Sequence, residues 1–175
     1  MKDNTFSFTS LTAAYVRYYH AEYSTPKIFH DHLARFLLTS EQIISLEQNL
    51  PALLPFISPQ KEAAYPEPDR AEALAQVVRD MLNASIILSR ARYSEDALIC
   101  SALQGVRQYV ILGAGMDTFA YRLPKAINQL QIFEADHPAT QEFKQKRLSD
   151  LGWVQPEYLH YIPIDFSQNG FISEL

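Results

Sequence analysis

Two glycines separated by one residue follow an apolar run and suggest a turn that could hold a ligand. The run is Tyr109–Leu112, and Gly113, Ala114 and Gly115 come directly after it. Glycine lets a backbone turn tightly and approach a bound molecule closely, as in nucleotide-binding folds. The pattern alone is weakly specific, and a tight turn without a ligand is the alternative. Thr118 stands where a dinucleotide fingerprint has its third glycine, which argues against binding of a pyrophosphate.

A second apolar segment, Gln131–Ala135, leads into two carboxylates. Glu134 and Asp136 would point to the same side of an ideal strand. An acidic side chain roughly 20 residues beyond the glycines is where such folds hold ribose hydroxyls. We predict Asp136, nearer the strand end, as the ribose ligand and Glu134 as the second candidate. The alternative for either residue is a cap on a helix starting at Pro138 or an ion pair with Arg122.

A third apolar segment, Leu159–Ile164, is followed by Asp165 and Phe166. In open parallel sheets, ligands bind beyond the carboxyl ends of the strands. An acidic residue followed by an aromatic one could there hold the amino group and the ring of an adenine. A plain turn or cap at Asp165 is the alternative.

These residues need a parallel sheet to bring them together, and the hydrophobic pattern predicts one. Residues 1–105 read as a helical region, and residues 106–175 alternate between strand and helix. Strands alternating with helices imply an α/β fold with right-handed crossovers. The first strand is a continuous apolar run, which is typical of burial on both faces.

Polar residues ahead of apolar periods predict where several helices begin. Ser10 is predicted to cap the first helix, Ser94 the helix that precedes the first strand, and Asp117 or Thr118 a helix after the glycines. Thr39 with a glutamine three residues later fits a capping box.

Composition excludes several classes of protein. The chain of 175 residues has a net charge of −5 and lacks a basic tract, so we expect no nucleic-acid partner. Cys100 is the single cysteine, so we predict neither an internal disulfide nor a metal site. Apolar runs are shorter than the roughly 20 residues that span a bilayer, and no signal sequence is visible. We therefore expect a cytoplasmic protein that does not enter membranes.

Two sequence segments together resemble a known family. Residues 110–124 (VILGAGMDTFAYRLP) and 133–141 (FEADHPATQ) are similar to the leucine carboxyl methyltransferases and their bacterial O-methyltransferase relatives. Residues 8–14 and 90–93 also resemble the corresponding segments of that family in residue type. The resemblance implies a Rossmann-like methyltransferase sheet, of which the chain would hold the first three strands. It also implies S-adenosyl-L-methionine as the cofactor.

The resemblance also suggests how each site residue would act. Gly113, Ala114 and Gly115 would approach the methionine part of the cofactor, Asp136 would hold the ribose, and Asp165 with Phe166 would contact the adenine. Arg92 matches a family arginine that binds the cofactor carboxylate, a role that suits a bidentate, charge-assisted donor. The alternative for Arg92 is a surface pair with Glu95 or Asp96. Arg17 matches a second basic contact only loosely.

The resemblance implies an S-adenosylmethionine-dependent O-methyltransferase acting on a carboxylate or a hydroxyl. A carboxylate is already ionised at neutral pH and needs no general base, whereas a hydroxyl would benefit from one. His137, beside Asp136, is the histidine nearest the predicted cofactor. The catalytic residues are not identified by the sequence.

Family members continue with further strands, so we expect the first strand to form an exposed apolar edge. Such an edge favours a homodimer or a second chain that completes the sheet. A non-catalytic remnant or interaction subunit is the alternative function. A nicotinamide-dependent oxidoreductase is a third possibility, which Thr118 disfavours.

Overall fold

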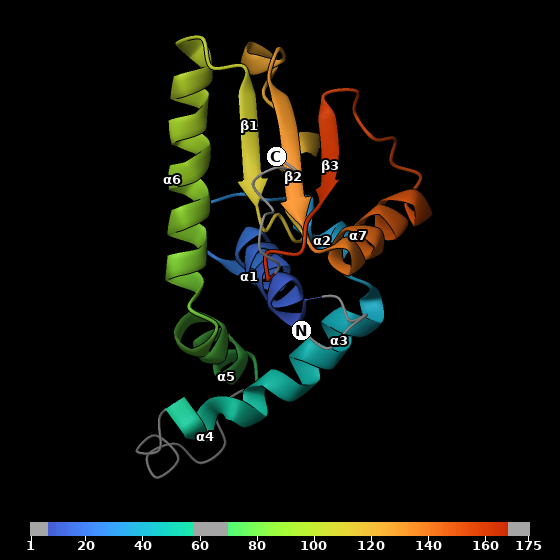
Figure 1. The fold of residues 1–175 in the computed structure, drawn as a ribbon. Coiled ribbons are helices and arrows are strands. Elements are labelled where there is room, and N and C mark those ends of the chain that lie inside the picture. The colour runs from blue at the N-terminus through green and yellow to red at the C-terminus, as the bar shows by residue number, and fades with distance from the viewer. Residues whose placement is uncertain (1–6, 58–69, 168–175) are drawn as a thin grey trace.

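The computed structural model describes residues 7–57 and 70–167 (Figure 1). Helices come first along the chain and strands follow. The α-helices before the sheet are α1 (Phe8–Tyr23), α2 (Ala34–Leu37), α3 (Ser40–Asn49), α4 (Leu54–Ile57), α5 (Arg70–Gln76) and α6 (Ala84–Leu103). Shorter turns of helix are η1 (Leu50–Leu53), the π-helical η2 (Val77–Met81), η3 (Phe119–Tyr121) and η4 (Lys125–Ile127).

The strands form one parallel sheet, which confirms the predicted α/β, Rossmann-like fold class. They are β1 (Gln108–Leu112), β2 (Gln131–Asp136) and β3 (Leu159–Pro163), in the spatial order β1-β2-β3. Leu112 pairs with Ala135, and Asp136 pairs with Pro163. Because the strands are parallel and in this register, their carboxyl ends meet at one edge of the sheet.

Helices flank the sheet, and the first helix lies at its carboxyl edge. In Figure 1, α6 runs beside β1, and α7 (Pro138–Asp150) connects β2 to β3. Pro138 is the first residue of α7, as predicted, because its missing N–H costs nothing there. The arrowheads of the strands point toward α1, so the first helix lies at the edge where the predicted site residues end.

Two hydrophobic clusters form the core. One is centred on the helices and includes Tyr15, Leu37 and Leu148, with Met116 from the turn after β1. The other, which includes Phe119 and Ile132, lies against the sheet. Met116 is 1% exposed, so the segment after the glycines is fixed by the same core as the N-terminal helices.

Two predicted helix starts are wrong. Ser7, and not Ser10, is the N-cap of α1, and its hydroxyl accepts a hydrogen bond from the Ser10 amide. Ser94 lies inside α6, which begins ten residues earlier after Asn83 in a left-handed conformation. Serine is compatible with a helix interior, so its capping preference alone did not fix either boundary. The predicted capping box of Thr39 and Gln42 is confirmed.

The glycine turn is not followed by the predicted α-helix. The chain forms only the 3₁₀ turns η3 and η4. Pro124 stops helix propagation here, because a proline ring clashes with the carbonyl four residues earlier. Asp117 caps locally instead, since its carboxylate accepts a hydrogen bond of 2.7 Å from the Phe119 amide.

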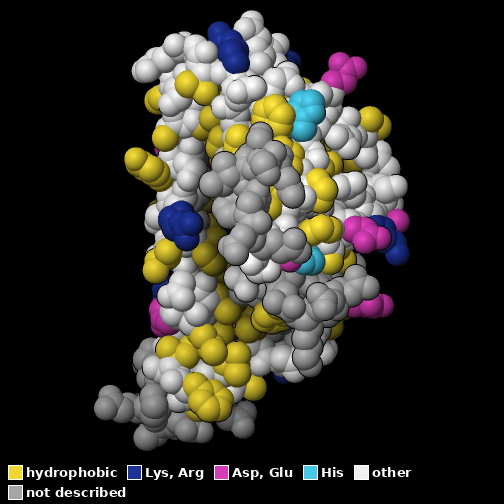
Figure 2. Space-filling view, in the orientation of Figure 1, with side chains coloured by type: hydrophobic (Ala, Val, Ile, Leu, Met, Phe, Trp, Pro, Cys, Tyr) yellow, Lys and Arg dark blue, Asp and Glu magenta, His cyan; other side chains and the backbone are white. Residues whose placement is uncertain are grey.

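Hydrophobic side chains gather on the surface over α6 and near α4 and α5 (Figure 2). Ile86 and Leu103 of α6 are 55% and 64% exposed, and Val110 and Leu112 of β1 are 45% and 60% exposed. The predicted burial of the first strand on both faces is therefore wrong, because no described element covers the face on which Val110 and Leu112 lie. Among the helices of residues 7–57 and 70–167, none is both long and apolar enough to cross a membrane.

Candidate functional site

The glycine turn is bound to the end of β2 by three consecutive backbone amides. Gly113 and Ala114 donate hydrogen bonds of 2.8 and 3.3 Å to the Ala135 carbonyl. Gly115 donates a hydrogen bond of 2.5 Å to the Asp136 carboxylate. The structure therefore brings the predicted glycines and the predicted ribose carboxylate into direct contact at the carboxyl edge of the sheet.

Both glycines adopt backbone conformations that other residues avoid. Gly113 has φ of +73° and Gly115 has φ of +52°. Among the described residues, no atom lies within 4 Å of a Cβ built at Gly113, so none of them fills the space at the first bend of the turn. A Cβ at Gly115 would lie 2.8 Å from the Ser10 Cβ, so the second bend is pressed against α1. The open side of the turn is thus the Gly113 side.

Two backbone amides hold Asp136, and no ion pair to it forms within the described part of the chain. One of its carboxylate oxygens accepts from the Gly115 amide, and the other accepts a 2.6 Å hydrogen bond from the His137 amide. The amino end of α7 lies directly beyond, and its dipole favours a negative charge there. A carboxylate has about four lone-pair sites, so Asp136 keeps capacity for two further donors. The alternative pair with Arg122 does not form, because Arg122 binds other carboxylates.

The end of β3 lies beside Asp136. Ile164 donates a 2.8 Å hydrogen bond to the Asp136 carbonyl, which places Asp165 and Phe166 at the same edge. Asp165 accepts hydrogen bonds from the amide and the hydroxyl of Ser167, so it forms the local turn that was the alternative prediction. Phe166 is 38% exposed. The adenine-binding role of this pair stays a prediction.

Arg92 is not joined to this edge by any contact with the residues that the structure describes. It lies on α6 with 58% of its side chain exposed, and it forms an ion pair of 2.6 Å with Asp96 one turn later. This is the surface pairing that was the alternative prediction. Glu95 instead turns inward toward Arg122. The cofactor-binding role of Arg92 stays a prediction.

Glu134, the second ribose candidate, occupies a different environment. Its carboxylate forms a 2.5 Å ion pair with Lys144 of α7, and both side chains are 1% exposed. Burial raises the pKa of Glu134 above its usual value, although Lys144 opposes that shift. Its second oxygen, Oε1, has no hydrogen-bond partner within residues 7–57 and 70–167. Glu134 is therefore enclosed beneath α7, and ribose binding by Asp136 stays a prediction.

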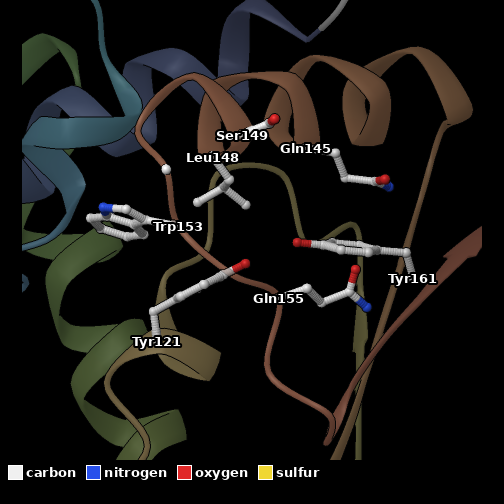
Figure 3. A pocket seen from close by; sticks show the side chains of 8 residues that line it. Tyr121, Gln145, Leu148, Ser149, Trp153, Gln155 and Tyr161 are labelled. Carbon is white, nitrogen blue, oxygen red and sulfur yellow. The ribbon is translucent and has the colours of Figure 1, made fainter.

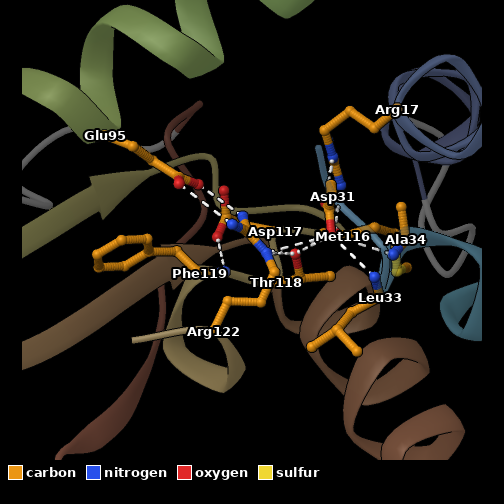
Figure 4. A network of polar contacts seen from close by, with 10 residues as sticks. All are labelled: Arg17, Asp31, Leu33, Ala34, Glu95, Met116, Asp117, Thr118, Phe119 and Arg122. Carbon is orange, nitrogen blue, oxygen red and sulfur yellow. Dashed lines mark hydrogen bonds and ion pairs between the residues drawn. The ribbon is translucent and has the colours of Figure 1, made fainter. Parts of the chain in front are cut away.

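A buried ionic network behind the glycine turn was not predicted from the sequence (Figure 4). At its centre is Asp31, which is 0% exposed and accepts hydrogen bonds from Arg17 and Thr118. Arg122 lies 3.2 Å from the same carboxylate and binds Glu95 through both terminal nitrogens. The network joins α1, the segment before α2, α6 and the turn after β1.

The network keeps Asp31 ionised. Burial alone would raise the pKa of Asp31, but Arg17 and Arg122 lower it below its usual value. Burial raises the pKa of Glu95, because its hydrogen bonds with Arg122 only partly offset the loss of water. Arg17 also donates a 2.6 Å hydrogen bond to the Met116 carbonyl, directly after the second glycine. Arg17 therefore binds the turn after β1 to Asp31 and to helix α1.

A separate pocket lies between α7, β3 and η3 (Figure 3). It has a volume of about 320 Å³, and its lining is aromatic and uncharged, with Tyr121, Trp153 and Tyr161 as the ring side chains. None of the predicted site residues lines it. The candidate site remains the carboxyl edge of the sheet.

A family profile and one relative match this chain over nearly its whole length, and a second relative matches about half of it. The family profile described as leucine carboxyl methyltransferase matches residues 10–175. YktD of Bacillus subtilis, named as a candidate S-adenosyl-L-methionine-dependent methyltransferase, is 39% identical over 96% of this chain and 55% of its own length. A similarly named protein of Mycolicibacterium smegmatis is 41% identical over 49% of this chain and 26% of its own length.

The chain thus spans about half the length of the relative that it matches most extensively. The match includes both the glycine turn and the end of β2, which the structure places in contact. The chain belongs to the leucine carboxyl methyltransferase family.

Proposed function

We propose that this chain binds S-adenosyl-L-methionine at the carboxyl edge of its sheet and takes part in the methylation of an oxygen acceptor. The observation that carries the proposal is the contact between the glycine turn and Asp136, through the 2.5 Å hydrogen bond from the Gly115 amide. The names of the relatives in Bacillus and Mycolicibacterium support the same cofactor.

The residues at this edge suit the parts of that cofactor. Asp136 has lone pairs left for two ribose hydroxyls, and two backbone donors already fix its orientation. The open side of Gly113 leaves room for an amino-acid tail against bare backbone. Asp165 and Phe166 follow the next strand and would meet the adenine.

Arg92 would supply the charge that the cofactor carboxylate needs. Its present partner is the exposed Asp96, and exposed ion pairs of this kind contribute little to stability. A ligand carboxylate could therefore replace Asp96 as the partner of Arg92 at little cost in free energy. A guanidinium offers two parallel donors to a carboxylate, which gives direction as well as charge.

When bound, the cofactor supplies an electrophilic methyl group on a positively charged sulfur. The task of the protein is then to align the acceptor oxygen with that group and to exclude water. His137 is committed to structure, because its Nδ1 accepts a hydrogen bond from the Ala139 amide and caps α7. A carboxylate acceptor, which needs no general base, suits such a site better than a hydroxyl.

We further propose that the exposed edge of β1 pairs with a strand from a second copy or from another chain. β1 is a terminal strand of the described sheet, and its Val110 and Leu112 side chains are 45% and 60% exposed on one face. An unpaired edge beside exposed apolar side chains favours such pairing. Light scattering coupled to size-exclusion chromatography tests this. A molar mass above that of one chain at micromolar concentration is the expected result, and a monomer at every concentration contradicts it.

Isothermal titration calorimetry with S-adenosylmethionine, S-adenosylhomocysteine and NAD tests the cofactor proposal. The adenosyl-amino acid ligands should bind and NAD should not. Asp136→Ala should abolish binding, and Arg92→Ala should weaken it, whereas Arg90→Ala on the same helix is the matched control. Normal binding by Asp136→Ala would overturn the ribose assignment.

A further inference from the structure

Asp31 lies far from the glycine turn in sequence but is bound to it in space. The Thr118 hydroxyl, 87 positions away, donates a 2.7 Å hydrogen bond to Asp31 Oδ1. The side chain is fully buried, and two backbone amides complete its coordination. Such a buried carboxylate, bound by several donors, fixes the position of the groups that bind it.

One arm of the network holds the far side of the glycine turn. Arg17 lies between Asp31 and the Met116 carbonyl, at 2.9 and 2.6 Å. Met116 immediately follows Gly115, whose backbone is already packed against Ser10 of α1. A shift of Arg17 would therefore move the turn relative to the first helix.

The other arm reaches the helix that carries Arg92. Arg122 lies 3.2 Å from Asp31 and binds both oxygens of Glu95, at 2.6 and 3.1 Å. Glu95 stands three residues after Arg92 on α6, so the two side chains leave the helix within one turn of each other. The orientation of this part of α6 relative to the glycine turn therefore depends on Arg122 and on the carboxylate that anchors it.

We propose that Asp31 is a positioning residue for the amino-acid part of the methyl donor. The inference rests on the proposed function, since the glycine turn and Arg92 are the groups that would hold that part. Asp31 touches neither the ligand nor the reacting atoms. It sets the spacing between the backbone that would flank the amino-acid tail and the arginine that would bind its carboxylate.

The geometry predicts an effect limited to one end of the ligand. The network reaches the turn at Met116 and reaches α6, whereas Asp136 makes no contact with Asp31 among those described and also accepts from the His137 amide, which lies outside the network. Loss of the Asp31 charge should therefore weaken a ligand with an amino-acid tail more than one without it. We expect a change on the order of tenfold, within the range known for indirect coupling between sites.

The test compares S-adenosylhomocysteine with methylthioadenosine, which lacks the amino-acid carboxylate and amine. Calorimetry on the wild-type chain and on Asp31→Asn gives two dissociation constants for each. The expected result is a loss of about tenfold in affinity for S-adenosylhomocysteine with little change for methylthioadenosine. Glu95→Gln, at the more exposed end of the network, should act in the same direction and serves if Asp31→Asn does not fold.

Glu134→Gln is the control for destabilisation without displacement of the turn, because it breaks a buried ion pair with Lys144. Thermal unfolding ranks the variants by stability. Equal weakening of both ligands in Asp31→Asn and Glu95→Gln, or the same selectivity in Glu134→Gln, would overturn the positioning role. Methylthioadenosine could bind too weakly to measure, and the affinity for S-adenosylhomocysteine then decides. Unchanged affinity in Asp31→Asn overturns the positioning role, and a loss of affinity that Glu134→Gln does not share supports it.

The wild-type titration separates this inference from the proposal beneath it. A wild-type chain that binds neither adenosyl ligand contradicts the proposed function and removes the positioning role with it. A wild-type chain that binds S-adenosylhomocysteine, with variants that bind it equally well, contradicts the positioning role alone.

Discussion

Replacement of Gly115 by alanine should destabilise the fold far more than the same change at Gly113. Both glycines have positive φ, at +52° and +73°, so each alanine incurs about 1–2 kcal/mol of backbone strain. At Gly115 the new methyl group would also lie 2.8 Å from the Ser10 Cβ. Overpacking of this kind typically costs about 1–3 kcal/mol. Gly115→Ala should therefore lose about 2–5 kcal/mol, and Gly113→Ala about 1–2 kcal/mol.

Urea unfolding followed by the fluorescence of Trp153, the single tryptophan, measures these differences. A double-mutant cycle with Ser10→Gly isolates the steric part, because that change removes the side chain that the new methyl group would meet. Ser10→Gly alone also loses the 2.7 Å hydrogen bond from the Ser10 hydroxyl to the Ser7 carbonyl. The cycle subtracts this cost.

In the Ser10→Gly background, the cost of Gly115→Ala should be about 1–3 kcal/mol smaller than in the wild type, and the cost of Gly113→Ala should be unchanged. Equal losses in the two alanine variants would refute the close approach of α1 to the turn. So would a double mutant whose cost is the simple sum of the single ones. Either result would mean that the first helix does not close the carboxyl edge of the sheet.

Three further perturbations probe other parts of the structure. Glu134→Ala should lower the free energy of unfolding in urea by about 3–5 kcal/mol, because it leaves Lys144 buried and unpaired. Glu134→Leu combined with Lys144→Met should be close to neutral, and a double variant whose loss equals the sum of the two single losses would contradict this. Folding lowers the pKa of Asp31, so the stability that its charge contributes should be present above about pH 4 and be lost as the pH falls further. Below about pH 4, the free energy of unfolding of Asp31→Asn should therefore depend less steeply on pH than that of the wild type. Parallel stability curves would argue against an ionised Asp31. Leu112→Lys should shift any dimer toward monomer in light scattering, because a lysine on a strand edge opposes pairing, and an unchanged molar mass would exclude this edge as the contact.

The sheet could be predicted because its signals are local. A continuous apolar run, a glycine that ends it and a proline that opens α7 each depend on a few neighbouring residues, and the alternation of strands and helices implies the parallel sheet. The helix starts could not be fixed in this way. Ser7, Ser10 and Ser94 all suit a cap chemically, and tertiary packing selects the one that is used.

The ionic network was missed for the opposite reason. Asp31 meets Thr118 across 87 residues, and nothing in the local pattern around either residue indicates the other. The one available signal was a carboxylate between two histidines in an otherwise apolar segment. A buried charge needs a partner, so such a residue predicts an unseen basic group without identifying it.

Glu134 and Asp136 show why position along a strand decides the role of a carboxylate. They are two residues apart on β2 and share a side of an ideal strand, so their sequence context hardly distinguishes them. Lys144 of α7 covers the first and neutralises it, since both side chains are 1% exposed. The second lies where α7 has only begun, so backbone amides hold it and leave part of it accessible. In a parallel sheet, the carboxylate available to a ligand is therefore the one at the last paired residue, because the crossover helix covers those before it.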